Sequence, residues 1–232
     1  ATTVPDYSGG PAPEWRKSRH RVPFHRIGAN YPACREAAQS PKVQSMKELI
    51  LGGARSGKSL FAERRAADSG LHVVYLATAE ARDDEMSRRI AHHRERRPSD
   101  WRTVEESLHL AAMLRETATA DTCIVVDCLT LWLSNLLFSG SGAAQAEAGL
   151  AFDCPLFNDE TAGLIAALPQ LPGSVIFVSN EVGWGIVPMH PVSRRFANEQ
   201  GRLNQRVAAV CQQVTLVAAG QPLTLKSPGA KP

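Results

Sequence analysis

An apolar run that leads into the stretch GGARSGKS constrains the fold of this 232-residue chain more than any other feature. The stretch occupies residues 52–59 and fits the pattern G-x-x-x-x-G-K-[ST]. It follows the apolar residues LIL at 49–51 and opens a helical pattern, which is the strand–loop–helix setting that the pattern requires. Glycines let backbone N–H groups turn toward phosphate oxygens, and the helix N-terminus adds positive potential. We therefore predict a nucleotide phosphate-binding loop, or P-loop, at residues 52–59.

The residues of this loop have distinct predicted roles. Lys58 would reach the terminal phosphates, and the Ser59 hydroxyl would bind Mg²⁺. The backbone of the preceding residues would surround the phosphates: Gly52, Gly53, Ala54, Arg55, Ser56 and Gly57. Asp127 ends the apolar run CIVVD on a strand expected to lie next to the P-loop strand, and it is the second predicted magnesium ligand. The alternative role for Asp127 is a cap of the following helix.

Short apolar runs alternate with helical patterns from Met46 onward. The runs cover 49–51, 72–77, 123–127, 174–179 and 214–218, and the helical patterns cover 58–68, 83–97, 106–119, 129–138, 158–168 and 193–212. Apolar strands separated by helices predict an α/β fold, a mostly parallel sheet with helices on both faces. We expect Asn180 and Glu181 to face a ligand, because such sheets bind ligands beyond the carboxyl ends of their strands.

Residues 1–45 differ in composition from the rest of the chain. They hold six of the fifteen prolines and a charge balance of +4, against +3 for the whole chain. The remainder is nearly neutral, so its charge gives no support to a nucleic-acid-coating function. We predict a disordered or weakly ordered extension over 1–45, with a basic docking arm as the alternative, and one domain over 46–232. Met46 is a candidate translation start, and 139–149 is expected to be a flexible surface loop.

Cysteine use and hydropathy indicate the compartment. The five cysteines are scattered without a CxxC pair, which argues against a disulfide framework or a structural zinc site. The chain contains no apolar run of about 18 residues and no signal-peptide core. We therefore expect a cytoplasmic protein without a membrane span.

Two adjacent histidines, His92 and His93, lie within the basic stretch RRIAHHRERRP. On a helix over 83–97, His93 shares an apolar stripe with Met86 and Ile90, whereas His92 points to the charged side. Geometry alone favours an exposed surface residue for His92. A neutral imidazole is nevertheless a good nucleophile toward phosphorus, and the surrounding arginines would lower its pKa. Both interpretations of His92 stay open on these residues alone.

Four stretches together resemble a known enzyme family. In order over about residues 47–220, they are GGARSGKS, YLATAEARDDEMSRRIAHHRERRPSDWRTVEE, NEVGWGIVP and GRLNQRVA. The block DDEM-x-x-R-I-x-HH-x-x-x-RP-x-x-W is far more particular than the P-loop. On these motifs the sequence is identified as a member of the bifunctional adenosylcobinamide kinase/adenosylcobinamide-phosphate guanylyltransferase family of cobalamin biosynthesis. Residues 1–45 and 139–153 lie outside the pattern of that family.

The resemblance implies a single RecA-like P-loop domain that forms a homotrimer in related enzymes. It implies phosphorylation of the aminopropanol hydroxyl of adenosylcobinamide by ATP or GTP with Mg²⁺, then transfer of GMP from GTP to adenosylcobinamide phosphate with release of pyrophosphate. The second step would pass through a GMP–histidine intermediate on His92. Lys58 and either Arg94 or Arg96 would stabilise the charged transition states. Besides the P-loop, the nucleotide contacts of the family match Ala77, Thr78, Ala79, His93, Arg94, Glu95, Arg96, Glu105 and Asp127.

Other functions remain as alternatives. A plain small-molecule P-loop kinase would transfer the γ-phosphate without a covalent nucleotide. A nucleotide switch or a nucleic-acid motor would need a partner-responsive loop or a basic face, and the neutral body lacks the latter, although the extension could be a nucleic-acid arm. A metal hydrolase is disfavoured because HHRE lacks a histidine pair at i, i+4. No NKxD guanine motif occurs, so the preference for GTP is implied only by the resemblance.

Overall fold

The computed structural model describes residues 45–80, 88, 97–139, 145 and 154–229, all within one compact unit that spans Ser40–Pro232. The described strands are β1 Lys47–Gly52, β2 His72–Ala77, β3 Arg102–Glu105, β4 Thr122–Asp127, β5 Ser174–Asn180, β6 Gln213–Ala218 and β7 Gln221–Lys226. The described helices are α1 Lys58–Ala67, α3 Leu110–Thr117, α4 Leu129–Phe138, α6 Pro155–Ala167, the 3-10 helix η2 Leu168–Gln170 and α7 Pro191–Val210.

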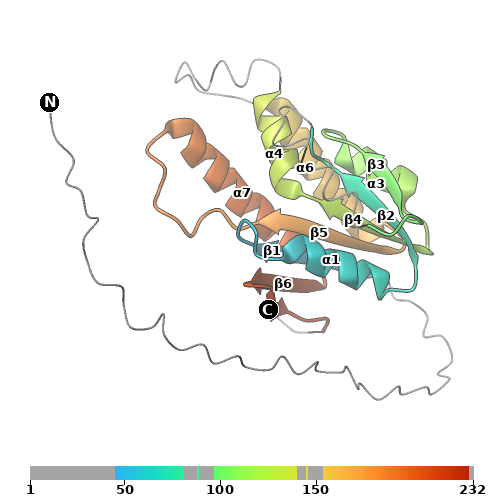
Figure 1. The fold of residues 1–232 in the computed structure, drawn as a ribbon. Coiled ribbons are helices and arrows are strands. Elements are labelled where there is room, and N and C mark those ends of the chain that lie inside the picture. Colours follow the sequence, from blue (N-terminus) through green and yellow to red (C-terminus); the bar gives the residue numbers. More distant parts are fainter. Residues whose placement is uncertain (1–44, 81–87, 89–96, 140–144, 146–153, 230–232) are drawn as a thin grey trace, which may run out of the picture. The chain divides into compact units, whose positions relative to one another are not determined.

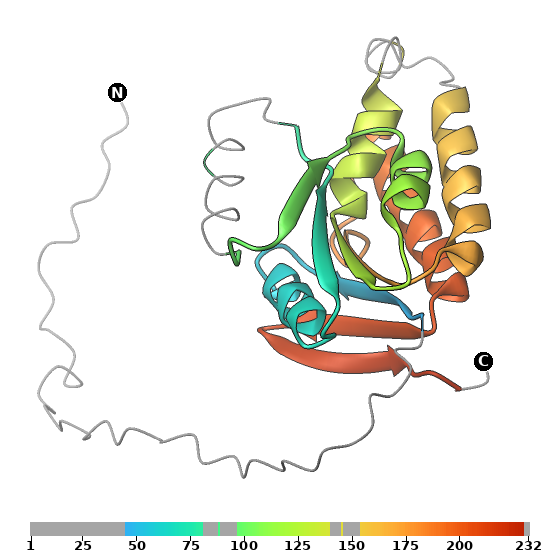
Figure 2. The ribbon, with the colours of Figure 1, turned by 90° about the vertical axis from the view of Figure 1, so that its right-hand side faces the viewer.

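In the described part of the chain the strands form one sheet in the order β3-β2-β4-β5-β1-β6-β7 (Figure 1). Neighbouring strands are parallel, except that β7 runs antiparallel to β6. Helix α1 covers one face of the sheet, and α3, α4, α6 and α7 cover the other (Figures 1 and 2). The predicted α/β fold, with a mostly parallel sheet and helices on both faces, is therefore confirmed.

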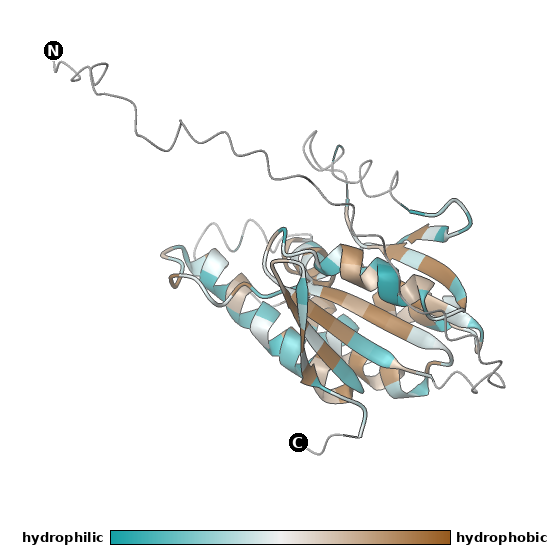
Figure 3. Cartoon of the chain, turned by 60° about the horizontal axis from the view of Figure 1, so that its bottom comes forward, coloured by the Kyte–Doolittle hydropathy of each residue, from teal (hydrophilic) through white to brown (hydrophobic). Residues whose placement is uncertain are grey.

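Successive side chains of each central strand enter two different cores. In β1, Leu49 and Leu51 face the four-helix side, whereas Ile50 packs with Ala62 of α1. Both faces are buried, so the central strands are apolar along most of their length (Figure 3). This burial explains why these strands could be recognised as continuous apolar runs.

All five predicted strands are present, whereas β3 and β7 correspond to no predicted strand. Both lie at edges of the sheet, and their residues are mostly exposed. Edge strands need no apolar run, and Pro222 within β7 argues against a strand unless it lies at an edge. Exposure at the edges therefore accounts for both omissions.

The predicted helices match the observed helices in their central residues and differ from them at their ends. The helix predicted at 129–138 has these bounds, and α6 and α7 begin earlier, each with a proline in its first turn. The helix predicted from 106 begins at Leu110, because the Glu106 carboxylate accepts hydrogen bonds from the amides of Leu108 and His109, both at 2.8 Å. The segments 83–97 and 139–149 lie largely outside the described residues.

The prediction that the strand of Asp127 lies next to the P-loop strand is wrong. Strand β5 lies between β1, which leads into the P-loop, and β4, which ends in Asp127. Apolar runs in the sequence show which segments are strands. The lateral order of the strands depends on the crossover connections, which no local sequence pattern reveals. Helix α1 spans the gap, since it packs on β4 and β5 as well as on β1.

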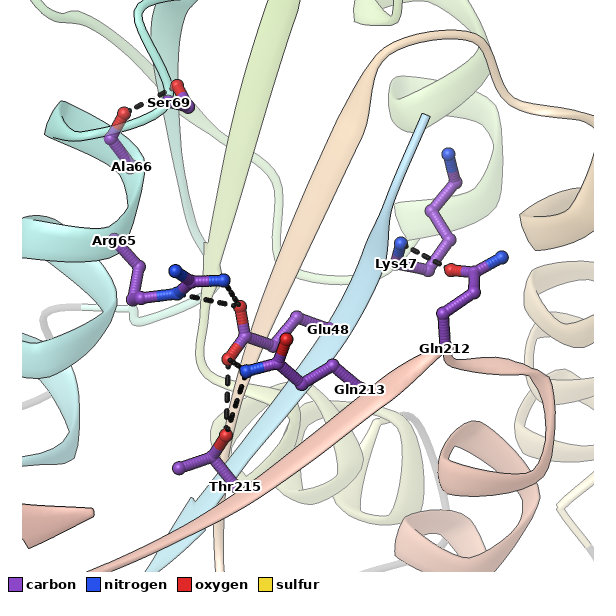
Figure 4. A network of polar contacts seen from close by, with 8 residues as sticks. All are labelled: Lys47, Glu48, Arg65, Ala66, Ser69, Gln212, Gln213 and Thr215. Atoms are coloured by element: carbon purple, nitrogen blue, oxygen red, sulfur yellow. Dashed lines mark hydrogen bonds and ion pairs between the residues drawn. The ribbon is translucent and has the colours of Figure 1, made fainter. Parts of the chain in front are cut away.

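A buried polar network lies at the amino end of β1, away from the P-loop (Figure 4). The Glu48 carboxylate is fully buried and forms an ion pair with Arg65 at 3.1 Å. Its other oxygen accepts from Gln213 at 3.0 Å and Thr215 at 3.2 Å. On the opposite face, the buried Lys47 ammonium donates to two backbone carbonyls, and burial lowers its pKa. The network joins β1, β6 and α1 at the end of β1 opposite the P-loop.

We expect Glu48→Gln to lower the free energy of unfolding by about 2 kcal/mol, because Arg65 loses its partner and faces an amide. Chemical denaturation measures this change. Glu116→Gln on the exposed side of α3 is the matched control and should stay within about 0.5 kcal/mol of the unmodified protein. Equal stability of both variants would show that the network does not stabilise the fold.

Candidate nucleotide-binding site

The P-loop connects β1 to α1 through two glycine positions that no other residue fits. A Cβ atom at Gly52 would lie 2.4 Å from Ser56 Oγ and 2.5 Å from the Val217 carbonyl oxygen. Gly57 is the N-cap of α1 and has a φ of 95°, in the left-handed region that favours glycine. The two glycines let the loop turn tightly before α1, as the motif predicts.

Lys58 is folded back over this loop. Its side chain is buried, and its Nζ donates a hydrogen bond to the Gly53 carbonyl at 3.1 Å. Gly53, Ala54 and Arg55 are exposed, so their backbone is open to a ligand. The loop thus combines accessible amides, the N-terminus of α1 and one ammonium group, which together suit a polyphosphate.

The carboxyl ends of three strands place further predicted residues in one row. Ala77 of β2 is in register with Asp127 of β4 on one side and with Glu105 of β3 on the other. Thr78 is fully buried, and its hydroxyl exchanges hydrogen bonds with the backbone of Cys128 at 2.8 and 2.9 Å. The chain after β2 is therefore fastened directly to the chain after β4.

Cys128 shows how close this row lies to the P-loop. Burial, and to a smaller extent the charge on the neighbouring Asp127, raise the pKa of its thiol to about 11, whereas the charge on Lys58 acts in the opposite direction. Helix α1, which begins at Lys58, also packs on β4. The P-loop lysine and the Asp127 row form one candidate site, even though β5 separates their strands.

Asn180 and Glu181 lie beside the loop, as expected from their place after β5. Asn180 is in register with Gly52, and the Glu181 amide donates to the Gly52 carbonyl at 3.1 Å. The Asn180 backbone is fixed by Thr130 Oγ1 at 2.8 Å and by Asn204 Nδ2 at 3.1 Å. Its side-chain oxygen is buried with no hydrogen-bond partner among the described residues, which leaves an acceptor next to the P-loop.

A tyrosine that sequence reasoning missed contacts Asp127. The Tyr75 hydroxyl donates a hydrogen bond to Asp127 Oδ2 at 2.7 Å. Burial raises the pKa of Tyr75 far above its usual range, and the charge on Asp127 and their hydrogen bond raise it further, so the phenol stays protonated. Above the ring, the Arg97 guanidinium carbon lies 3.4 Å from the ring centroid.

The remaining unpredicted contacts hold Asn180 and the P-loop in place. Gln200 Nε2 and Ser179 Oγ both donate to Asn204 Oδ1, at 3.0 and 2.6 Å, in a buried cluster under Asn180. The Gly220 amide donates to the Ser56 carbonyl at 2.8 Å, so the turn after β6 braces the P-loop. Long-range contacts of this kind leave no local pattern in the sequence. Of the clustered residues under Asn180, only Asn204 lies within a matched motif, GRLNQRVA, and that match was the one sequence signal for this cluster.

The oxygen ligands proposed for magnesium fit the chemistry of that ion. Asp127 supplies a carboxylate at the end of β4, and Ser59 supplies a hydroxyl in the first turn of α1. Within the described ranges, no group of three or more His, Cys, Asp or Glu side chains is arranged to hold a metal. Magnesium commonly uses one or two protein oxygens together with substrate phosphates and water, so this sparse set suits it.

The predicted histidine cluster cannot be placed. His92, His93, Arg94, Glu95 and Arg96 lie outside the described residues. Arg97 is the first described residue after them, and it lies over Tyr75. The chain that carries the histidines therefore re-enters the described structure at a residue that contacts the partner of Asp127.

An apolar loop over residues 181–190 connects β5 to α7 next to the site. Four of its side chains are strongly exposed: Trp184 at 74%, Ile186 at 97%, Val187 at 71% and Met189 at 92%. Its start is tied to the P-loop, since the Glu181 amide donates to the Gly52 carbonyl. Its end is tied to α7, since Arg194 donates to the Pro188 carbonyl at 3.0 Å. A concentration of exposed apolar side chains on an anchored loop marks a contact surface.

Comparison with known proteins gives consistent matches over the folded part of the chain. The family model for cobinamide kinase / cobinamide phosphate guanyltransferase matches residues 48–225. The bifunctional adenosylcobalamin biosynthesis protein CobP of Pseudomonas aeruginosa is 53% identical over 78% of this chain and 98% of its own length. The corresponding protein CobU of Salmonella typhimurium is 41% identical over 78% of this chain and all of its own length.

Solved structures with a similar fold include a KaiC-like protein from Pyrococcus horikoshii. The TM-score is 0.45 at 12% identity, over 82% of this chain and 81% of that chain, a distant similarity of fold alone. None of the described helices is long and apolar enough to cross a membrane.

Proposed function

Because the chain belongs to the cobinamide kinase / cobinamide phosphate guanyltransferase family, we propose that it catalyses both reactions on adenosylcobinamide. The first transfers the γ-phosphoryl group of ATP or GTP to the aminopropanol hydroxyl. The second transfers GMP from GTP to the new phosphate and releases pyrophosphate. The observation that carries the proposal is the P-loop with its buried Lys58 at the start of α1, a helix that also packs on β4, the strand that ends in Asp127.

In the kinase step the protein acts by positioning and by neutralising charge. The backbone amides of the P-loop and the N-terminus of α1 hold the phosphates, and Lys58 compensates the charge that builds up during transfer. Mg²⁺, held by Asp127 and Ser59 together with the phosphates, would supply further charge compensation when bound. The substrate oxygen attacks the γ-phosphorus, the nucleoside diphosphate leaves, and the hydroxyl proton passes to solvent or to a nearby carboxylate.

In the transferase step we propose that His92 is the nucleophile. A neutral imidazole nitrogen attacks the α-phosphorus of GTP, the bond to the β-phosphate oxygen breaks, and pyrophosphate leaves. A phosphate oxygen of adenosylcobinamide phosphate then attacks the same phosphorus and releases the imidazole. Arg94 or Arg96 would stabilise the charge in both displacements. The other proposed nucleotide contacts in this segment are His93 and Glu95, and Ala77, Thr78, Ala79 and Glu105 are the proposed contacts along the row.

We propose a homotrimer that acts in the cytoplasm, with no nucleic-acid partner and a domain that begins near Met46. The P-loop and the Asp127 row belong to one compact unit, which agrees with catalysis by a single domain.

A two-stage product analysis tests the function. Purified protein, adenosylcobinamide and ATP should yield adenosylcobinamide phosphate, and addition of GTP should convert it to adenosylcobinamide-GDP with equimolar pyrophosphate. Mass spectrometry separates the products. Formation of the phosphate alone, with GTP present and consumed as phosphoryl donor, would leave a plain kinase as the better conclusion.

The apolar loop fits the corrinoid part of this substrate. The reacting hydroxyl must reach the nucleotide at the P-loop, so the attached macrocycle must rest on surface close to it. The apolar loop joins the P-loop through Glu181 and offers exposed apolar area there. We propose that Trp184, Ile186 and Met189 contact the apolar faces of the corrinoid.

We expect the double variant Ile186→Ser, Met189→Gln to weaken binding of adenosylcobinamide about 10-fold or more, because apolar burial is lost. Nucleotide affinity should be unchanged, since neither side chain contacts the P-loop in the described structure. Equilibrium dialysis followed by corrinoid absorbance measures the first quantity. Leu225→Gln on β7, where the leucine is 56% exposed, is the matched control. Unchanged corrinoid affinity with a smaller mass in light scattering would assign the loop to a subunit interface instead.

A further inference from the structure

The Asp127 carboxylate is held from one side by Tyr75, which begins the matched stretch YLATAEARDDEM but is not among the predicted site residues. Tyr75 donates to Oδ2 alone, at 2.7 Å, so Oδ1 is left for other ligands. A hydrogen bond from a neutral hydroxyl to a carboxylate is short and strong, and it restricts rotation of the carboxylate. Partners of this kind orient metal-binding carboxylates and affect metal affinity without touching the metal.

Tyr75 is itself held in place by apolar packing and by a contact with Arg97. It is 3% exposed and packs with apolar residues of α1 and the central strands, including Ala62 and Val125. The Arg97 guanidinium lies over its other side at 3.4 Å from the ring centroid, a cation–π contact. A substitution that removes only the hydroxyl would therefore leave the packing of the ring intact.

Within the described part of the chain, Arg97 has few other partners that explain its position. Its guanidinium donates one long hydrogen bond to Thr103 Oγ1, at 3.4 Å. Its Nε is buried and has no hydrogen-bond partner among the described residues. The contact with Tyr75 is therefore the main interaction of Arg97 with the described residues.

We propose that Tyr75 is a positioning residue for the Asp127 carboxylate, and that Arg97 acts on the same carboxylate by holding Tyr75. The proposal rests on the proposed function, since it takes Asp127 to be a magnesium ligand. It assigns Tyr75 and Arg97 roles that act through another residue, and neither needs to touch the substrate. The physical link consists of two contacts in series, Arg97 to Tyr75 and Tyr75 to Asp127.

Tyr75→Phe tests the first contact because it removes the hydroxyl and keeps the ring. Mn²⁺ binding is followed by electron paramagnetic resonance in the presence of a GTP analogue with a methylene group between the α- and β-phosphorus atoms, which cannot donate GMP. We expect Mn²⁺ affinity to fall about 10-fold. Affinity for the analogue in EDTA should be unchanged, because the P-loop is untouched.

Arg97→Met tests the second contact because it removes the cation and keeps an apolar stem. We expect a weaker Mn²⁺ affinity, by a smaller factor than in Tyr75→Phe. In the double variant the effect of Arg97→Met should disappear, since it acts only through the hydroxyl. Arg102→Met, at an exposed arginine on the neighbouring β3, is the matched control and should bind Mn²⁺ as the unmodified protein does.

A purely structural role would give a different result. Tyr75→Phe and Arg97→Met would then lower the melting temperature and leave the Mn²⁺ affinity of the folded protein unchanged, which overturns the proposal. Additive losses in the double variant would overturn the link through Arg97. Because these measurements use no corrinoid, failure of the unmodified protein to bind Mn²⁺ with the analogue would count against the proposed function and not against Tyr75 alone.

Discussion

Replacing His92 with alanine is expected to lower the transfer of GMP by at least about 10³-fold while phosphorylation of adenosylcobinamide continues nearly unchanged. The reason is the division of labour between two groups. A covalent nucleophile is essential to the step that passes through it, and no other side chain replaces the bond that it forms. The kinase step needs only the P-loop, Lys58 and the metal ligands, which belong to a separate part of the chain.

Two labelled forms of GTP distinguish the mechanisms in the absence of corrinoid. Label at the α-phosphate should become bound to the protein, in a form stable to alkali and labile to acid, and label at the γ-phosphate should not. His92→Ala should abolish the bound label. His72→Gln, at an exposed histidine at the start of β2, is the control and should retain it. Retention of guanylylation in His92→Ala would eliminate the covalent mechanism on His92. The two histidines would then be interpreted as part of a basic surface.

The central strands were predictable because both faces of the sheet are covered. Burial on both faces makes each of these strands a continuous apolar run, for instance Ile124 to Val126 in β4. The edge strands β3 and β7 lack that requirement and gave no pattern. The lateral order was not predictable either, since placing β5 between β1 and β4 depends on how the crossovers pass over the sheet.

The candidate site was predictable where one residue needs another nearby in the sequence. The P-loop is such a case, because Gly52 and Gly57 serve one continuous turn. Tyr75 and Asn204 were missed because their partners, Asp127 and Asn180, are distant in sequence. A tyrosine within an apolar strand is most simply taken as a core residue, and only the folded structure brings its hydroxyl to a carboxylate.

Lys58→Ala should reduce both activities, by about 100-fold or more, which distinguishes it from His92→Ala. A single polyphosphate site that serves both reactions requires this result. The lysine ammonium is buried and fixed by the Gly53 carbonyl, so its charge acts in a water-poor setting where it is strongly felt.

Steady-state rates of both half-reactions, each with its own product assay, measure the effect. The change should appear mainly in kcat, since stabilisation of developing charge is lost, while the loop amides continue to bind the phosphates. Arg64→Ala, at an exposed cation in the last turn of α1, is the matched control and should leave both rates unchanged. If Lys58→Ala impaired phosphorylation but left guanylylation intact, GTP would have to bind for the second reaction at a separate site, and the P-loop would serve the kinase step alone.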